Sequence, residues 1–109
     1  MENVKKSHQN INDTFLEGNL LSDPKIRLTG NGPWCNFDLA FNDGDATICI
    51  GISTMGGLAQ WCNSMLSKGD RIIVKGRLVS SAWENEHGKH RRIELRAMHI
   101  KNLSMAVAG

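Results

Sequence analysis

The 109-residue sequence lacks the long hydrophobic stretches that anchor proteins in membranes. No apolar run approaches the roughly 20 residues that a helix needs to cross a bilayer. The first eight residues contain no apolar core, so they resemble neither a secretory signal peptide nor an arginine-rich transit peptide. We therefore expect a cytoplasmic protein without membrane contact.

Cysteine is scarce, and its spacing excludes the common cysteine motifs. No Cys-x-x-Cys pair occurs, and more than ten residues separate each cysteine from the next: Cys35, Cys49, Cys62. We expect three reduced thiols rather than a disulfide scaffold. His87 and His90 are spaced like metal ligands, but no third and fourth ligand follow in register, so we expect no metal and no cofactor.

Catalytic motifs are also missing. The sequence contains no Gly-x-Ser-x-Gly, no His-Glu-x-x-His and no phosphate-binding loop. It has no repeat, linker or low-complexity tract, and its length suits one domain with one core. These absences predict a single non-enzymatic domain.

Positive charge is concentrated in the second half of the chain, although the net charge is only +2. Residues 1–67 carry four Lys or Arg against seven Asp or Glu, whereas residues 68–109 carry nine against four. Basic residues on strand-like segments favour a surface for a polyanion. An ordinary solvated surface is the alternative interpretation.

Alternating apolar and polar residues predict strands over most of the chain. The predicted strands are 14–28, 35–41, 47–52, 70–79 and 89–103. Gly18 suits a bulge or a close backbone approach, and Ser22-Asp23-Pro24 suits a kink in the first strand. Asp43-Gly44 is a favoured turn pair between the second and third strands.

One segment has the period of a helix instead. Apolar residues recur at helical spacing: Leu58, Trp61, Cys62, Met65, Leu66. They predict a helix of about three turns, with Thr54 as N-cap and Gly69 just beyond the C-terminus.

The order of three strands, one helix and two strands predicts an all-β fold with one helix. It is the order of a five-stranded antiparallel OB-fold barrel, with the helix between strands three and four. We expect residues 13–104 to form this domain, residues 1–12 a flexible N-terminal arm and residues 105–109 a frayed C-terminus. The predicted core includes Phe15, Phe37, Phe41, Trp61, Ile72, Val74 and Leu78.

Several collinear segments resemble the bacterial-type single-stranded DNA-binding protein family. They are Gly18–Arg27, Asn31-Gly32, Asn36–Ala40, Leu58-Ala59, Lys68–Asp70, Val74–Leu78, Trp83–Lys89 and Glu94. The resemblance covers residues 14 to about 103. It implies an OB-fold homo-oligomer, with a tetramer favoured and a dimer possible, that coats and protects single-stranded DNA regardless of sequence. It also implies a part in DNA replication, repair and recombination.

Two tryptophans are candidates for stacking on DNA bases. Trp83 lies beside a polar hairpin, where no neighbouring core residues cover its ring, and the resemblance places a stacking Trp there. Trp34 has the opposite parity to Cys35, Phe37 and Leu39, so it points away from the barrel core. For Trp83 the alternative is packing under the hairpin or in an oligomer contact, and for Trp34 it is a subunit interface.

Basic residues are candidates for phosphate contacts. The resemblance implies such a role for Arg27, Lys68, Lys89, Arg91 and Arg92. Lys75, Arg77 and Arg96 on the predicted strands are further candidates. Solvated strand surface is the alternative for these three and for Arg91 and Arg92.

The sequence departs from the family pattern at several positions. Cys49-Ile50 replaces a Trp-His pair, Met55 replaces an aromatic residue, and Val79–Ala82 replaces a basic cluster. The Gly-rich linker and acidic C-terminal tip of the family have no counterpart, so we expect no acidic tail that recruits other proteins. Two rival functions are a protein-interaction module of a replication or replication-restart complex and an RNA-binding OB domain.

Overall fold

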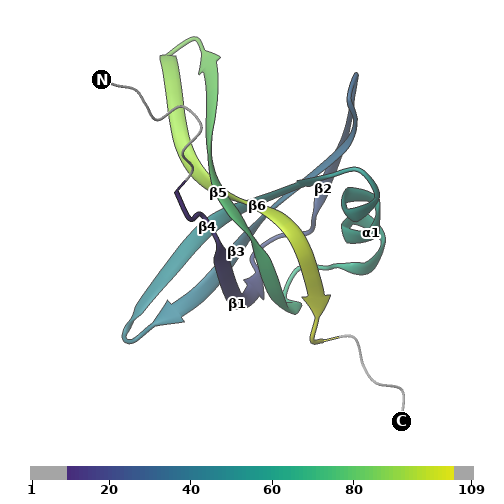
Figure 1. Cartoon of the computed structure of the whole chain (residues 1–109), viewed down its shortest axis with the longest axis vertical. Helices are drawn as coiled ribbons and strands as arrows, with labels where there is room; N and C mark the ends of the chain where they lie inside the picture. The colour runs from purple at the N-terminus through teal and green to yellow at the C-terminus, as the bar shows by residue number, and fades with distance from the viewer. Residues whose placement is uncertain (1–9, 105–109) are drawn as a thin grey trace.

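The computed structural model describes residues 10–104, which form six strands and one helix around a barrel (Figure 1). The elements are β1 (Thr14–Leu20), β2 (Lys25–Thr29), β3 (Gly32–Asp43), β4 (Ala46–Met55), α1 (Gly57–Met65), β5 (Arg71–Asn85) and β6 (Gly88–Asn102). The predicted N-terminal arm and C-terminal end fall mostly at residues 1–9 and 105–109, which lie outside the described residues.

Hydrogen bonding runs through the sheet in the order β1-β5-β6-β4-β3-β2, and pairing of β1 with β3 closes five of these strands into a barrel. The pairs are antiparallel except for β4 and β6, which run parallel over Gly51–Ser53 and Glu94–Arg96. The predicted OB-fold barrel is therefore confirmed, with one parallel seam that the sequence pattern did not indicate.

The first predicted strand is divided into β1 and β2, so the helix follows the fourth strand segment rather than the third. The break falls at Leu21–Pro24, where a kink was predicted. The backbone N–H of Lys68 donates to Asp23 Oδ1 at 2.8 Å and ties the break to the end of the helix. Proline cannot donate to a ladder, which explains why pairing stops here.

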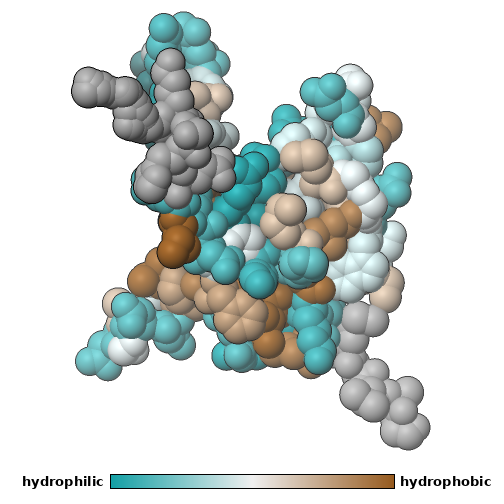
Figure 2. Space-filling model, in the orientation of Figure 1, coloured by the Kyte–Doolittle hydropathy of each residue, from teal (hydrophilic) through white to brown (hydrophobic). Residues whose placement is uncertain are grey.

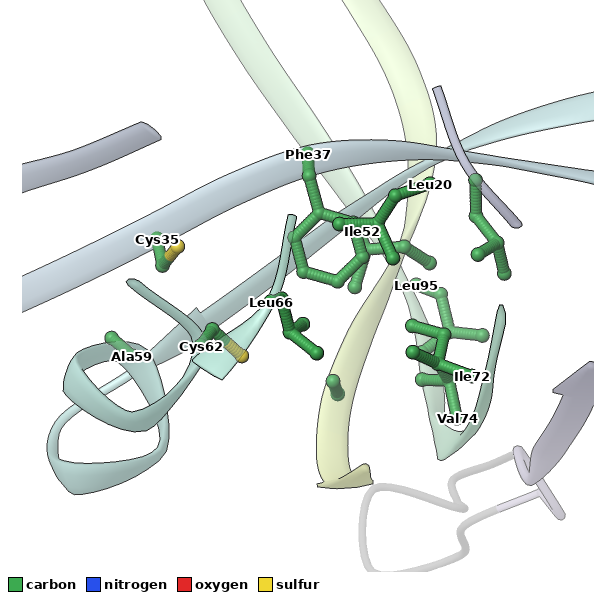
Figure 3. Close-up of a cluster of buried hydrophobic side chains, with 12 residues drawn as sticks. Leu20, Cys35, Phe37, Ile52, Ala59, Cys62, Leu66, Ile72, Val74 and Leu95 are labelled. Atoms are coloured by element: carbon green, nitrogen blue, oxygen red, sulfur yellow. The ribbon is translucent and has the colours of Figure 1, made fainter. Parts of the chain in front are cut away.

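Aliphatic, cysteine and aromatic side chains from β1, β3, β4, α1, β5 and β6 fill the barrel (Figure 3). Leu39, Ile72, Val74 and Leu95 are fully buried at its centre. Trp61 packs against this core from the helix, and Phe37 is 4% exposed, as predicted for both.

The helix spans Gly57–Met65, within the predicted segment, but it begins differently. Its N-cap is Gly56 at φ 69°, with no side-chain cap. The prediction of Thr54 as N-cap was wrong because β4 continues through Met55. Thr54 is buried there, and its hydroxyl donates to the Ala97 carbonyl at 3.1 Å across the parallel seam.

Two predicted core residues are exposed. Phe15 on β1 is 71% exposed, and Leu78 on β5 is 40% exposed. Leu78 lies beyond Gly76, the last residue of β5 that pairs with β1. From there β5 and β6 extend beyond the barrel as a ribbon (Figure 1). Asn12, predicted to be part of a flexible arm, instead exchanges two hydrogen bonds with the Leu78 backbone at 2.8 and 2.9 Å.

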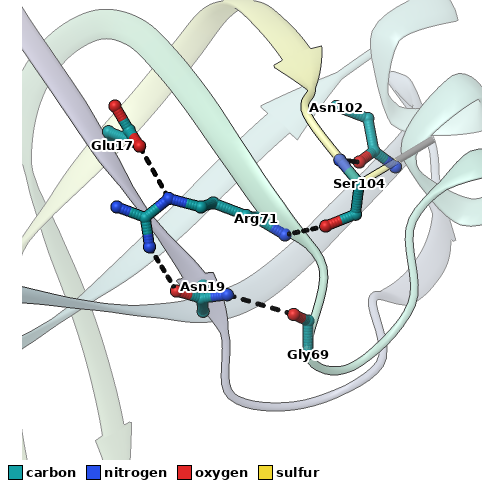
Figure 4. A network of polar contacts seen from close by, with 6 residues as sticks. All are labelled: Glu17, Asn19, Gly69, Arg71, Asn102 and Ser104. Atoms are coloured by element: carbon teal, nitrogen blue, oxygen red, sulfur yellow. Dashed lines mark hydrogen bonds and ion pairs between the residues drawn. The ribbon is translucent and has the colours of Figure 1, made fainter. Parts of the chain in front are cut away.

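A polar network fastens β1 to β5 and to the end of β6 (Figure 4). Arg71 Nε donates to Glu17 Oε2 at 2.6 Å, and an Arg71 terminal nitrogen donates to Asn19 Oδ1 at 2.9 Å. The Asn19 amide donates to the Gly69 carbonyl at 3.1 Å, while the Arg71 backbone N–H donates to the Ser104 hydroxyl at 2.9 Å. These contacts close the end of the barrel opposite the β5–β6 ribbon.

Two of the three cysteines are fully buried, and one is exposed. Contact with Cys35, together with burial, raises the pKa of the Cys62 thiol far above its usual range. Cys49 is the exposed thiol. We expect one thiol to react rapidly with an excess of a thiol-specific reagent in the native protein and three after denaturation. Rapid reaction of two or more native thiols, counted by mass spectrometry, would contradict this core.

Close approach of β1 to β3 requires glycine at position 18, as predicted. A Cβ added there would overlap the Ala40 carbonyl oxygen. We expect Gly18→Ala to lower the free energy of unfolding by about 1–3 kcal/mol, because the seam that closes the barrel must shift. Gly30→Ala is the control, since a Cβ there meets nothing within 4 Å. Equal urea midpoints for the two variants would show that the close approach is absent.

Candidate nucleic-acid interface

Two arms project from the barrel (Figure 1), and residues of both arms line a groove between them. One arm is the β5–β6 ribbon, and the other is the β2–β3 hairpin. The surface between them is largely hydrophilic in Figure 2. The groove encloses about 570 Å³ and is lined by Arg27, Thr29, Trp34, Asn36, Ser53, Ser81, Trp83, Arg92, Glu94 and Arg96.

Strand register places one face of β5 and β6 toward this groove. Ser81 is paired with Arg92, and Trp83 with His90, so these side chains share a face. A β-bulge at Lys75/Gly76 changes the register, because Lys75 pairs with His99 and Gly76 with Ala97. Met98 of β6 is skipped in this pairing. Arg92, Glu94 and Arg96 therefore point toward the groove.

Trp83 lies on the ribbon within a cluster of polar and basic side chains. Its ring stacks on His90, with centroids 5.3 Å apart and planes 22° apart. The Arg92 guanidinium lies 5.9 Å from the Trp83 ring centroid. Trp83 remains 45% exposed, so part of its ring surface is open to a ligand.

Trp34 lies on the opposite arm, and its predicted orientation away from the core is confirmed. It is half-buried, and the Arg96 guanidinium lies 4.7 Å from the centroid of its ring. Arg96 Nε also donates to the Ser53 hydroxyl at 2.8 Å. Arg27 is the cross-strand partner of Trp34 and extends the basic surface along this arm.

A carboxylate lies at the bottom of the groove between two arginines. Glu94 is 4% exposed, with its oxygens 3.8 Å from Arg92 Nε and 3.7 Å from an Arg96 terminal nitrogen. The two guanidinium groups offset the cost of burying one carboxylate. The floor therefore carries both signs of charge.

Gly51 on β4 provides room for Arg92. A Cβ at position 51 would lie 3.0 Å from a terminal nitrogen of Arg92, which is tighter than ordinary contact. The Arg92 guanidinium therefore lies against the β4 backbone. The exposed Cys49 and the half-buried Ile50 line the adjoining hollow with it.

Five of the ten predicted binding residues meet in the groove, and five do not line it. Trp34, Trp83, Arg27, Arg92 and Arg96 line the groove. Arg77 lies opposite Arg96 and lines the adjoining hollow with Met55 and Met98. Lys89 and Arg91 line a second hollow on the ribbon, with Trp83. Lys68 follows the helix, and Lys75 lies beside Phe15.

Sequence reasoning did not identify Glu94, Ser53, Asn36 or Gly51 as part of the site. Glu94 alternates with Arg92 and Arg96 along the predicted strand. This spacing was sufficient to predict that its side chain lies on the same face as those two arginines. Its burial was not predictable, because it depends on the pairing of β6 with β4, a contact between segments far apart in the sequence.

The fold and the groove define a small barrel protein whose open face combines indole rings with guanidinium groups. A sequence model described as the single-strand binding protein family matches residues 11–103. The chain therefore belongs to the single-strand binding protein family.

Curated relatives named single-stranded DNA-binding protein are similar to most of this chain. The Thermus thermophilus protein is 32% identical over 108 residues, which are 91% of this chain and 41% of the relative. The Thermotoga maritima protein is 31% identical over 91 residues, 74% of this chain and 64% of the relative. The chain thus spans about two fifths of the Thermus relative and less than two thirds of the Thermotoga relative.

Two further features bear on possible ligands. Within residues 10–104, no group of three or more His, Cys, Asp or Glu side chains is arranged to hold a metal ion. In the same part of the chain, no helix is long and apolar enough to span a membrane.

Proposed function

We propose that the chain binds single-stranded DNA along the groove, without catalysis and largely without regard to sequence. The observation that carries this proposal is the pair of indole rings, Trp34 and Trp83, on opposite arms of one arginine-lined groove. Membership of the family and the printed names of its relatives support the same ligand.

Stacking would supply much of the affinity. Every base has a π face, so an exposed ring binds any base, at about 1–3 kcal/mol per stacked base. Trp83 offers part of its ring in the free protein, while Arg96 lies over Trp34. We infer that a base displaces the guanidinium from Trp34 or stacks beside it.

Phosphates would contact the arginines that rim the groove. Arg27 is exposed on the β2–β3 arm, and Arg92 and Arg96 lie along β6. Such contacts release counterions, so affinity should fall as salt rises. Helix α1 contains no Lys or Arg, which argues against a recognition helix in the major groove of a duplex.

We also propose that the chain forms homo-oligomers, with a tetramer favoured and a dimer possible. Phe15 on β1 and Leu28 on β2 are 71% and 83% exposed. Large apolar side chains at this exposure favour burial between subunits. Among the described residues, the Thr14–Gly18 part of β1 pairs only with β5, so its other edge is open.

Trp83→Ala should weaken binding of oligo-dT by about 1–3 kcal/mol, because one stacking surface is lost. The quenching of intrinsic tryptophan fluorescence by oligo-dT should decrease but persist, since Trp34 remains. Trp61→Phe is the control, because Trp61 packs against the core from the helix and does not line the groove. Unchanged affinity in Trp83→Ala would contradict the stacking role.

Arg27→Ala should reduce the slope of log affinity against log salt by about 0.7, the value for one lost phosphate contact on a single strand. Lys75→Ala should leave that slope unchanged, because Lys75 does not line the groove. Titrations at four salt concentrations measure both slopes. A larger change in slope for Lys75→Ala than for Arg27→Ala would show that DNA binds a face of the barrel other than the groove.

Phe15→Asp should shift the protein to a smaller oligomer, because it puts a charge into an apolar contact. Phe15→Leu keeps the contact apolar and should preserve the assembly. Light scattering coupled to size-exclusion chromatography measures the mass of each. The same mass for wild type and Phe15→Asp would exclude this surface from the subunit contact.

A further inference from the structure

Within residues 10–104, no donor lies within hydrogen-bond distance of the buried carboxylate of Glu94. Its side chain is 6% exposed and lines the groove. Among residues 10–104, the nearest cationic atoms are those of Arg92 and Arg96 at 3.8 and 3.7 Å, beyond hydrogen-bond distance. A buried carboxylate that has ion-pair partners but no hydrogen bond calls for an explanation. A ligand that supplies donors in the groove would provide one.

The polar atoms on the groove floor follow a defined order along β6. Oε1 of Glu94 faces Arg92, and Oε2 faces Arg96. A ligand in the groove therefore meets a donor, two acceptors and a second donor. Carboxylate oxygens only accept, and guanidinium nitrogens only donate, so the order does not depend on tautomers.

Guanine matches this order better than the other bases. Its Watson–Crick edge presents the O6 acceptor followed by two donors, N1–H and N2–H₂. The donors fit the two Glu94 oxygens, and O6 fits one guanidinium. Cytosine and adenine each place an acceptor nitrogen next to their amino group, and thymine has one N–H between two carbonyls. Each of these bases would bring an acceptor against the carboxylate.

Glu94 also lies between the two indole rings. Arg92, beside Trp83, and Arg96, beside Trp34, are four residues apart on β6, or roughly 13 Å at strand spacing. A strand stacked on both rings would cross Glu94 with the bases between them. A base there can turn its edge to the floor, which is how single-stranded nucleic acids are commonly read.

We propose that Glu94, with Arg92 and Arg96, forms a subsite that prefers guanine within a groove that otherwise accepts any base. This inference rests on the proposed function, because it requires the strand to lie along the groove. Stacking and phosphate contacts provide binding to every sequence, and the subsite adds a preference at one position. Glu94 thereby determines base preference rather than overall affinity.

The test compares three oligonucleotides of equal length bound to the full chain. One is oligo-dT, one has single guanines separated by thymines, and one has inosine at the same positions. Inosine lacks only the N2 amino group. We expect guanine to bind at least about fivefold tighter than oligo-dT, the lower bound for a good bidentate base contact, with inosine in between.

A Glu94→Gln variant tests the residue itself. An amide offers one acceptor rather than two, so the ratio of guanine to oligo-dT affinity should fall to about one. Glu86→Gln is the matched control, because Glu86 lies at the exposed tip of the ribbon, and it should keep the wild-type ratio.

Three results would overturn the inference. Equal wild-type affinities for the three oligonucleotides would remove the guanine preference but leave the proposed function intact. An unchanged ratio in Glu94→Gln, with both affinities lowered together, would show that Glu94 only positions the arginines. Binding of none of the oligonucleotides would overturn the proposed function and the guanine subsite together.

Discussion

The pairing of β5 with β6 is the constraint on which the groove depends. Inside the barrel, Ile72 and Val74 lie opposite Asn102 and Ile100, whereas beyond the bulge Gly76 lies opposite Ala97. Because one residue of β6 is skipped, Leu95 and Ala97 remain in the core. The alternate residues Arg92, Glu94 and Arg96 then face the groove. One irregularity in the ladder thus serves both packing and the site, as bulges near functional sites commonly do.

Charge in the groove is balanced locally rather than uniformly basic. Arg92 and Arg96 each contact an indole ring and approach the same buried carboxylate. Their guanidinium groups are therefore oriented before any ligand arrives, which limits the entropy lost on binding. The absence of basic residues at Val79–Ala82 is partly offset, because Arg92 lies opposite Ser81 on the same face.

The periodicity of apolar residues was sufficient to predict the barrel, the segment that forms the helix and the outward orientation of Trp34, although not the division of the first strand that puts the helix after the fourth strand. The same pattern did not predict burial correctly where burial depends on whether another strand covers the side chain. Phe15 has the pattern of a core residue, but no described element covers its side chain, and it is 71% exposed. A side chain that points out of a barrel can face the groove, as Arg96 does, or another side of the barrel, as Lys75 does. The alternation of apolar and polar residues along a strand does not distinguish these two sides. Glu94 is buried where β6 pairs with β4, opposite Gly51 and between Arg92 and Arg96.

The central claim is that single-stranded DNA lies between the two arms and across the floor formed by β6. Photo-cross-linking of bromouracil-substituted oligo-dT, with the sites mapped by mass spectrometry, tests this path most directly. We predict cross-links on both arms, at Trp34 and Trp83, with none near Lys75 and Phe15. Cross-links concentrated around Lys75 and Phe15, with neither tryptophan modified, would contradict the account.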